Sequence, residues 1–201
     1  FHCGVKVGRF VLPMVGRHNA LNSVAVSAVA LNLGLTADEV RVALQGFRGI
    51  KRRQEIVGEQ NGVVVIDAFA HHPTAIHLTL EGVKAAYPGS RLWAIFEPRS
   101  ATSRRNVFQD SFPAGFRLAD KVIIAGLFAP EKIKQADRLD PEKMVNEMRG
   151  LGVDASYIAE VDDIVEFIAV NSRPRDVVLI MSSGGFSGIH QKLLRRLAFA
   201  P

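Results

Sequence analysis

Residues 63–74 decide the fold and read Val63-Val64-Val65-Ile66-Asp67-Ala68-Phe69-Ala70-His71-His72-Pro73-Thr74. The first four are apolar and β-branched, which predicts a short strand that is buried on both faces. Pro73 suits the first turn of a helix, because the N–H that proline lacks has no partner there in any case. The stretch therefore predicts a strand, a polar loop that begins at Asp67, and a helix.

The same alternation of apolar runs and helical segments continues from about residue 50 to residue 201. It indicates an α/β fold, in which a mostly parallel sheet carries helices on both faces. Residues 54–60 are expected to add an antiparallel strand. The other expected strands are 62–66, 92–96, 121–125, 155–158 and 177–181, and the expected helices are 73–86, 106–117, 141–150, 162–171 and 187–197.

A shorter piece precedes the sheet. Residues 5–12 alternate partly between apolar and polar and end at Pro13, which predicts a strand. Residues 19–33 predict a helix that is apolar nearly all round and therefore buried. Thr36-Ala37-Asp38-Glu39 is a capping box for another helix that ends near Gly46. Since a strand and two helices are too little for a domain, we expect residues 1–46 to end a domain that lies mostly upstream, and residues 47–201 to form a second one.

The composition is that of a globular protein, with 48% of the 201 residues hydrophobic and 22% charged. No apolar run reaches the ~18 residues that suggest a membrane span, and the first residues do not resemble a signal peptide. Cys3 is the only cysteine, which excludes an intramolecular disulfide. A reduced, cytoplasmic setting is therefore the default expectation, and no membrane partner is expected.

The net charge of +5 favours anionic partners such as nucleotides or phosphorylated metabolites. Basic clusters occur at residues 51–53, 104–105 and 195–196. Because they are short, scattered and define no single helix or stripe, nucleic acid is not an expected partner.

The loop from Asp67 to Thr74 should lie at the carboxyl end of the sheet, where parallel sheets bind their ligands. Backbone N–H groups at the following helix start could receive an anion, with imidazoles beside it. A plainer alternative is that Asp67 only caps the helix and the histidines are solvated, and the residue types leave both open. His71, His72 and His77 do not have the spacing of a helical metal site and no cysteine joins them, so no metal site is expected.

Two further loops share this end of the sheet. Arg99 follows the expected strand 92–96, where an arginine is placed to bind a carboxylate or phosphate through two parallel hydrogen bonds. The glycine-rich segment 182–188 lets a backbone approach a ligand closely, but it does not match the dinucleotide-binding fingerprint.

Polar residues also open the apolar helix near the N-terminus. His18 and Asn22 are four apart and share a face, with Asn19 beside them. Such groups need hydrogen-bonding partners, which a heterocyclic base could supply, whereas capping explains only one of the three. The sequence contains neither a phosphate-binding Gly-x-x-x-x-Gly-Lys-Ser/Thr loop nor a Gly-x-Ser-x-Gly elbow, so it has no self-contained catalytic apparatus.

Taken in order, five segments resemble the Mur ligases of peptidoglycan synthesis. They are Gly16-Arg17-His18-Asn19-x-x-Asn22, Gly49-Ile50-Lys51-Arg52-Arg53-Gln54-Glu55, Phe69-Ala70-His71-His72-Pro73-Thr74, Phe96-Glu97-Pro98-Arg99-Ser100 and Ser183-Gly184-Gly185-Phe186-Ser187-Gly188-Ile189-His190-Gln191-Lys192. The resemblance covers nearly the whole chain. It implies a central ATPase domain, to which residues 1–46 would belong, and a Rossmann-like C-terminal domain, residues 47–201.

The resemblance also implies a reaction. ATP with Mg²⁺, bound mainly by the central domain, would phosphorylate the carboxylate of UDP-N-acetylmuramate, and an amine would attack the acyl phosphate. The murein tripeptide L-Ala-γ-D-Glu-meso-diaminopimelate is the expected amine, with L-alanine as the alternative. Residues 1–201 alone are then expected to be inactive, because the phosphate-binding loop would lie in upstream domains. A non-catalytic nucleotide- or peptide-binding module is the rival hypothesis.

The resemblance implies roles for individual residues. His18, Asn19 and Asn22 would surround adenine, and Arg53 and Asp67 would contact the nucleotide. The peptide pocket would be formed by Phe69, His71, His72, Arg99, Ser183 and Gly184, and residues 46–49 would be the hinge of a domain closure.

One position departs from the family pattern. Relatives usually carry two acids before the aromatic residue of the third segment, whereas this chain has Asp67-Ala68. The second acid is associated with the nucleotide, so its role is missing at Ala68. Either Asp67 substitutes for it through a small shift, or the full-length protein binds ATP weakly.

Overall fold

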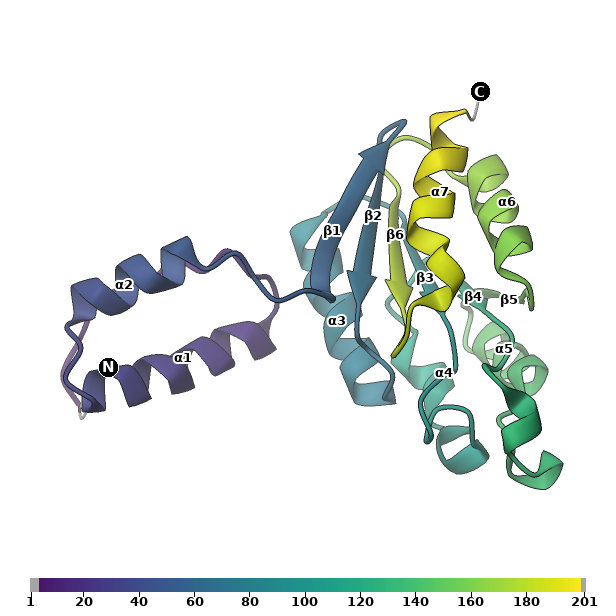
Figure 1. Ribbon diagram of the computed structural model, residues 1–201, viewed down its shortest axis with the longest axis horizontal. Helices are drawn as coiled ribbons and strands as arrows, with labels where there is room; N and C mark the ends of the chain where they lie inside the picture. Colours follow the sequence, from purple (N-terminus) through teal and green to yellow (C-terminus); the bar gives the residue numbers. More distant parts are fainter. Residues whose placement is uncertain (1–3, 200–201) are drawn as a thin grey trace. The chain divides into compact units, whose positions relative to one another are not determined.

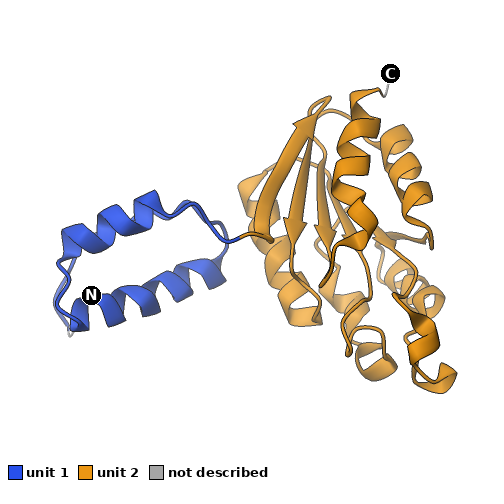
Figure 2. Cartoon of the chain, viewed as in Figure 1, with its two compact units in different colours: residues 1–50 blue, residues 51–201 orange. Residues whose placement is uncertain are grey.

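A computed structural model describes residues 4–199. The chain divides into two compact units, Phe1–Ile50 and Lys51–Pro201 (Figure 2). The division lies within a few residues of the expected domain boundary, and the assignment of the first unit to an ATPase domain stays a prediction. Among residues 4–199, no helix has both the length and the apolar character that crossing a membrane requires.

The first unit contains two helices, α1 (Arg17–Asn32) and α2 (Ala37–Gly46). The predicted capping box is confirmed: the backbone N–H of Glu39 donates to the Thr36 hydroxyl, and the backbone N–H of Thr36 donates to the Glu39 carboxylate. The strand expected over residues 5–12 is wrong, since only Val5 makes a β-bridge and the rest is irregular backbone. A strand needs a neighbour for its backbone hydrogen bonds, and residues 4–50 supply none.

The expectation that α1 is buried is also wrong. Leu21, Val24 and Val26 are more than half exposed, whereas Ser23 and Ser27 are buried. The two serine hydroxyls donate to backbone carbonyls one turn earlier, which satisfies them on the covered face. A helix that is apolar on every side cannot be covered by one helix and one extended segment.

The second unit is built on a six-stranded sheet in the order β1-β2-β6-β3-β4-β5 (Figure 1). β1 is antiparallel to β2, and every other neighbouring pair is parallel. The sequence-based strands are therefore confirmed, with end points shifted by at most two residues. The strands are β1 (Arg53–Gln60), β2 (Val63–Ala68), β3 (Leu92–Phe96), β4 (Lys121–Ile124), β5 (Asp154–Tyr157) and β6 (Val177–Met181).

Helices cover both faces of this sheet, as expected. One face packs against α3 (Pro73–Ala86), α4 (Phe112–Gly115) and α5 (Pro141–Gly150), and the other against α6 (Val161–Asn171) and α7 (Ile189–Ala198). Successive residues of β6 alternate between these two cores, and all five are buried. This explains why the central strand β6 is apolar throughout, whereas the edge strand β5 contains Asp154 and Ser156.

Two expected helices differ from the structure. Residues 106–117 form a 3₁₀ turn (Asn106–Phe108) and the separate short α4, because Pro113 has no N–H to continue a helix from residue 106. α7 begins at Ile189 rather than 187, since Ser187 (φ 48°) and Gly188 (φ 71°) are left-handed. The remaining short turns are Pro130–Lys132, Gln135–Asp137 and Phe186–Gly188.

The sheet order brings three loops together. β6 lies between β2 and β3 and is parallel to both, so the residues that follow these strands meet at one edge of the sheet. Asp67 of β2, Glu97 after β3 and Ser182 after β6 are all buried there. This edge is where the candidate site lies.

Candidate functional site

Asp67 is a buried carboxylate with two basic neighbours. Arg52 Nε donates to Asp67 Oδ2 at 3.0 Å, and His190 Nε2 lies 3.3 Å from Asp67 Oδ1. Burial alone would raise the pKa of Asp67, but His190 and Arg52 outweigh it and hold the pKa below its usual range. Asp67 is therefore a charged group whose Oδ2 accepts from Arg52, while Oδ1 lies beside His190 without a hydrogen bond among residues 4–199.

Arg52 ties the end of β2 to the glycine-rich loop. Its Nη2 donates to the carbonyl oxygens of Ser182 at 2.7 Å and Gly184 at 2.8 Å. Its own carbonyl accepts from the backbone N–H of Phe69 at 2.6 Å. One side chain thus fixes the position of two loops that are more than a hundred residues apart in sequence.

Ser182 links the ends of β6 and β3. Its hydroxyl accepts from the backbone N–H of Gly184 at 2.9 Å and donates to Glu97 Oε2 at 2.5 Å. Ser182 and Glu97 are both buried. The glycine-rich loop is therefore held by buried hydrogen bonds. The other carboxylate oxygen of Glu97 faces Arg99.

Arg99 lies above this anchor, with its side chain 26% exposed. Its Nη1 is 3.5 Å from Glu97 Oε1, and its guanidinium carbon lies 3.6 Å from the ring centroid of Phe128. Phe128 belongs to the loop after β4. Sequence reasoning selected Arg99 correctly as a residue at the edge of the sheet, and the structure places it with Gly184 and Glu97.

The Phe69–Thr74 segment forms another side of the site. Phe69 packs edge-on against His71, with centroids 4.9 Å apart, and Arg52 lies 5.4 Å from the centroid of Phe69. His72, not Asp67, caps α3, because its Nδ1 accepts from the backbone N–H of Thr74. Burial lowers the pKa of His71, and the neighbouring His72 lowers it further.

Arg53 stands apart from this cluster. It is exposed and lies opposite Ala68 across the β1–β2 pair, whereas Arg52 pairs with Asp67. Ser183 and Gly184, both half-buried, follow Ser182 in the glycine-rich loop. The structure thus brings Asp67, Phe69 and Gly184 together through Arg52.

Sequence reasoning missed several residues of this cluster. Glu97 and Ser182 directly follow predicted strands, which is a signal that could have found them. Arg52 appeared only as part of a basic cluster. His190 appeared only within the fifth segment that resembles the family, and Phe128 was not distinguished from the other residues of its loop.

The three polar candidates of the first unit lie at the start of α1. Asn19 is buried and donates to the carbonyl of Val15 at 2.7 Å, so it stabilises the helix start. His18 is half-buried, and its Nδ1 has no hydrogen-bond partner among residues 4–199. Asn22 is exposed.

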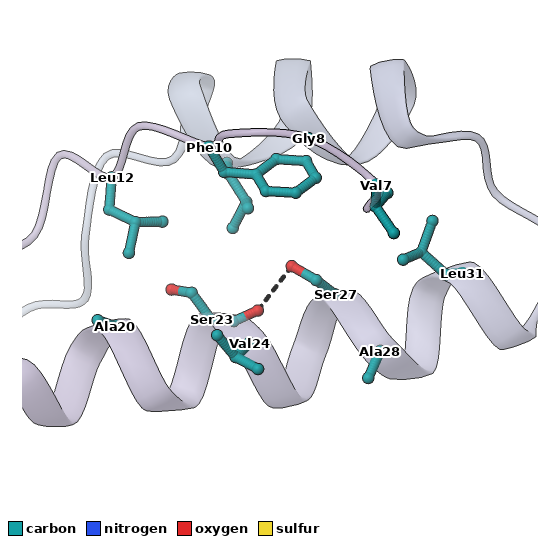
Figure 3. Close-up of a pocket in the computed structure, with 11 residues that line it drawn as sticks. Val7, Gly8, Phe10, Leu12, Ala20, Ser23, Val24, Ser27, Ala28 and Leu31 are labelled. Atoms are coloured by element: carbon teal, nitrogen blue, oxygen red, sulfur yellow. Dashed lines mark hydrogen bonds between the residues drawn. The ribbon is translucent and has the colours of Figure 1, made fainter. Parts of the chain in front are cut away.

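A separate apolar pocket of about 330 Å³ lies between the extended segment 7–12 and α1 (Figure 3). Ser23 and Ser27 face Phe10 across it in this view, and Ser27 donates to the Ser23 carbonyl. His18, Asn19 and Asn22 do not line it. The pocket therefore does not support a role of these three residues in binding a nucleotide.

The donor set does not fit a metal ion held by this chain alone. Within residues 4–199, no group of three His, Cys, Asp or Glu side chains is arranged to hold one. Asp67 accepts from Arg52 and lies beside His190, and Glu97 accepts from Ser182.

Known proteins with similar sequences are ligases. Residues 52–184 match the family described as Mur ligase, glutamate ligase domain. A UDP-N-acetylmuramate–L-alanyl-γ-D-glutamyl-meso-2,6-diaminoheptandioate ligase of Escherichia coli (strain K12) is 36% identical over 97% of this chain and 41% of its own length. A UDP-N-acetylmuramate–L-alanine ligase of Desulfitobacterium hafniense (strain Y51) is 33% identical over 95% of this chain and 42% of its own length.

A solved structure is similar over nearly the whole chain. The murein peptide ligase of Psychrobacter arcticus 273-4 has a TM-score of 0.71 and 37% identity, over 94% of this chain and 39% of that protein. The chain thus spans about two fifths of the length of the relatives it matches. The family match and the α/β fold with its mostly parallel sheet agree with each other. This chain belongs to the Mur ligase family.

Proposed function

We propose that this chain is the peptide-binding part of a longer ATP-dependent ligase of peptidoglycan recycling. The ligase would form an amide between the carboxylate of UDP-N-acetylmuramate and the amine of L-Ala-γ-D-Glu-meso-diaminopimelate. The relatives in Escherichia coli and Psychrobacter arcticus, whose names describe this type of ligase, support the proposal. A cytoplasmic location, the default expectation from the single cysteine, is part of the proposal.

The observation that carries the peptide-binding role is the position of Arg99. A partly exposed guanidinium at the carboxyl end of a parallel sheet, supported by a buried acid, is suited to bind a carboxylate of the peptide. Phe69, His71, His72, Ser183 and Gly184 would form the rest of the pocket. The exposed face of Phe69 and the neutral imidazole that the lowered pKa of His71 favours would contact the peptide backbone.

Nucleotide contacts would come from other residues. His18, Asn19 and Asn22 would surround adenine, and the exposed Arg53 would reach the phosphates. Asp67 was a candidate for the nucleotide, but its pairing with Arg52 and His190 favours an organising role instead. ATP and Mg²⁺, bound mainly by upstream domains, would supply the acyl phosphate chemistry. Residues 46–49 would be the hinge of the domain closure.

The proposal is tested with the complete reading frame. The full-length protein should form the amide with the tripeptide and ATP, and residues 1–201 alone should form none and hydrolyse no ATP. Residues 1–201 should still bind the tripeptide weakly in calorimetry, and Arg99→Ala should abolish that binding. Turnover by residues 1–201 alone would contradict the proposal that upstream domains are needed for catalysis. Equal tripeptide binding by the unmodified chain and by Arg99→Ala would show that Arg99 is not part of the site.

Ligation of L-alanine is the second candidate activity. The 33% identical relative in Desulfitobacterium hafniense, named as an L-alanine ligase, favours it. The full-length protein separates the two candidates directly, because each predicts a higher kcat/KM for its own amine. A reading frame without a phosphate-binding loop upstream would instead favour a non-catalytic nucleotide- or peptide-binding module.

A further inference from the structure

The Arg99 side chain is confined by residues from three separate loops. Oε1 of Glu97, which follows β3, lies 3.5 Å from Arg99 Nη1. The ring centroid of Phe128, which follows β4, lies 3.6 Å from Arg99 Cζ. Gly184, after β6, lies against its other end. A Cβ built on Gly184 would be 1.9 Å from Arg99 Nε, 2.3 Å from Cδ and 2.4 Å from Cζ.

Gly184 leaves open the space that the Arg99 side chain occupies, although its backbone does not require glycine. Its φ is outside the left-handed range, so an alanine would fit the backbone conformation. The three atoms nearest to the added Cβ all belong to the Arg99 side chain. Any side chain at position 184 would therefore push the guanidinium out of its present place.

The loop that carries Gly184 is held against movement in the opposite direction. The Gly184 N–H donates to the Ser182 hydroxyl at 2.9 Å, and its carbonyl accepts from Arg52 at 2.8 Å. The Ser182 hydroxyl is buried and donates to Glu97. Because Gly184 is fixed on both sides, Arg99 would have to move rather than the loop.

Phe128 is held over Arg99 although its side chain is 41% exposed. Its backbone N–H donates to the carbonyl of Pro98 at 3.1 Å, and its carbonyl accepts from Arg104 at 2.9 Å. The backbone of Phe128 is thus fixed to the segment that carries Arg99. Stacking of this kind leaves the in-plane N–H groups of a guanidinium free to donate.

The charges around Arg99 leave it free for an anion. One carboxylate oxygen of Glu97 accepts from the Ser182 hydroxyl. The other makes a single long contact of 3.5 Å with Arg99 Nη1. Arg104 is engaged by the carbonyls of Phe128 and Ala129, and Arg52 by Asp67. Within residues 4–199, Glu97 is the only acceptor found for Arg99, although a guanidinium has five N–H donors.

We propose that Gly184 and Phe128 are positioning residues, which hold the Arg99 guanidinium in place for a carboxylate of the amine-bearing substrate. Gly184 provides the space and Phe128 the supporting face, so Arg99 is ordered before the ligand binds. The identity of the ligand rests on the proposed function. The ordered arginine itself does not, and it can be measured without any ligand.

The ligand-free measurement is the Nε–H signal of Arg99 in a ¹H–¹⁵N spectrum of residues 1–201, assigned by its loss in Arg99→Ala. The signal should be displaced from free-arginine values by the Phe128 ring in the unmodified chain. It should move towards those values in Gly184→Ala and in Phe128→Leu. Gly185→Ala is the matched control, because a Cβ at that position meets nothing within 4 Å.

The second measurement is calorimetry with the murein tripeptide, and with a tripeptide whose carboxylates are converted to amides. Gly184→Ala should weaken tripeptide binding about tenfold, the typical effect of one displaced charge-assisted hydrogen bond. Gly185→Ala should bind like the unmodified chain, and the amide peptide should bind weakly to all variants. Since Arg99→Ala should abolish tripeptide binding, the dependence on Arg99 is read from the amide peptide, whose weak affinity Gly184→Ala should leave unchanged.

The outcomes separate the two claims. An Arg99 signal at free-arginine values in the unmodified chain, or one that Gly184→Ala and Phe128→Leu leave in place, overturns the positioning roles. A Gly184→Ala effect that is equally large for the tripeptide and for the amide peptide overturns them as well. A displaced signal combined with no tripeptide binding leaves the ordered arginine established and shows that the proposed peptide ligand is wrong.

Discussion

The guanidinium of Arg52 donates a 3.0 Å hydrogen bond to the carboxylate of Asp67, fifteen positions further along the chain. The next residue, Arg53, is exposed and lies opposite Ala68. Two adjacent arginines therefore have different tasks. Arg52 organises the carboxyl end of the sheet, which leaves Arg53 available to a ligand.

Replacing Arg52 by methionine should lower the free energy of unfolding by about 2 kcal/mol, because it leaves a buried carboxylate and two carbonyls without their donor. Urea denaturation measures this change. Arg53→Met is the matched control and should stay within about 0.5 kcal/mol of the unmodified chain, as exposed substitutions usually do. Equal losses of unfolding free energy in the two variants would contradict the different roles of Arg52 and Arg53.

The contrast between these arginines shows what the sequence could not predict. Apolar runs predicted the five parallel strands, and the signal is plainest in β3 and β6, whose residues are all buried. The mostly polar β1 was expected only as an added antiparallel strand. The choice between Arg52 and Arg53 depends on backbone details instead: Arg52 has φ 62°, Gln54 has φ 57°, and the register with β2 shifts between residues 53 and 55. The irregular start of β1 turns Arg52 towards Asp67 and leaves Arg53 exposed. Residue types alone do not reveal such an irregularity.

Other failures have the same origin in tertiary contacts. The pattern of α1 correctly predicted a helix but not its exposure, since exposure depends on what packs against it. The site residue Phe128 looked like an ordinary loop residue, and only its distance of 3.6 Å from Arg99 marks it. Arg99 itself was predictable, because position at the end of a parallel strand is a sequence-level signal.

The stability of the chain should fall in acid partly through Asp67. Its folded pKa is below the ordinary value of 3.8, so the unfolded chain takes up a proton first as the pH falls. The stabilisation is complete above about pH 4 and is lost as the pH drops through the folded pKa. Asp67→Asn should flatten the acid side of the stability–pH curve, whereas Glu81→Gln, at an exposed position of α3, should leave its shape unchanged. An unchanged acid side in Asp67→Asn would show that Asp67 is not the group responsible.

Another buried acid lies at the opposite end of the sheet. Asp176 accepts from Arg91 and from the indole N–H of Trp93 at 2.9 Å, and its side chain is 3% exposed. Asp176→Ala should lower the free energy of unfolding by roughly 3 kcal/mol, since it leaves both donors buried without their acceptor. Because this end is remote from the ligand-binding loops, tripeptide affinity measured below the unfolding transition should not change. A loss of affinity in the folded variant would contradict that separation.

His71 should titrate below the ordinary histidine pKa of 6.5, because it is partly buried and lies near His72 and Arg53. The ring C–H signals in an NMR titration give the midpoint. His72→Asn should raise it, because asparagine can still cap α3 but carries no positive charge. A midpoint at or above 6.5 in the unmodified chain would show that His71 is more solvated than its contacts indicate.

Ala68 offers the sharpest test of how the full-length protein would bind ATP. Asp67 is engaged by Arg52 and His190, which argues against its substituting for the missing second acid. Ala68→Asp would place a carboxylate at a buried position opposite the exposed Arg53, where the family resemblance implies an acid. In the full-length protein it should lower the KM for ATP about tenfold, the effect expected of one charge-assisted hydrogen bond. Ala68→Asn, which has the same shape without the charge, should do so much less. If neither variant changes the KM, Asp67 or another group already fills that role, and the departure at Ala68 has no cost for nucleotide binding.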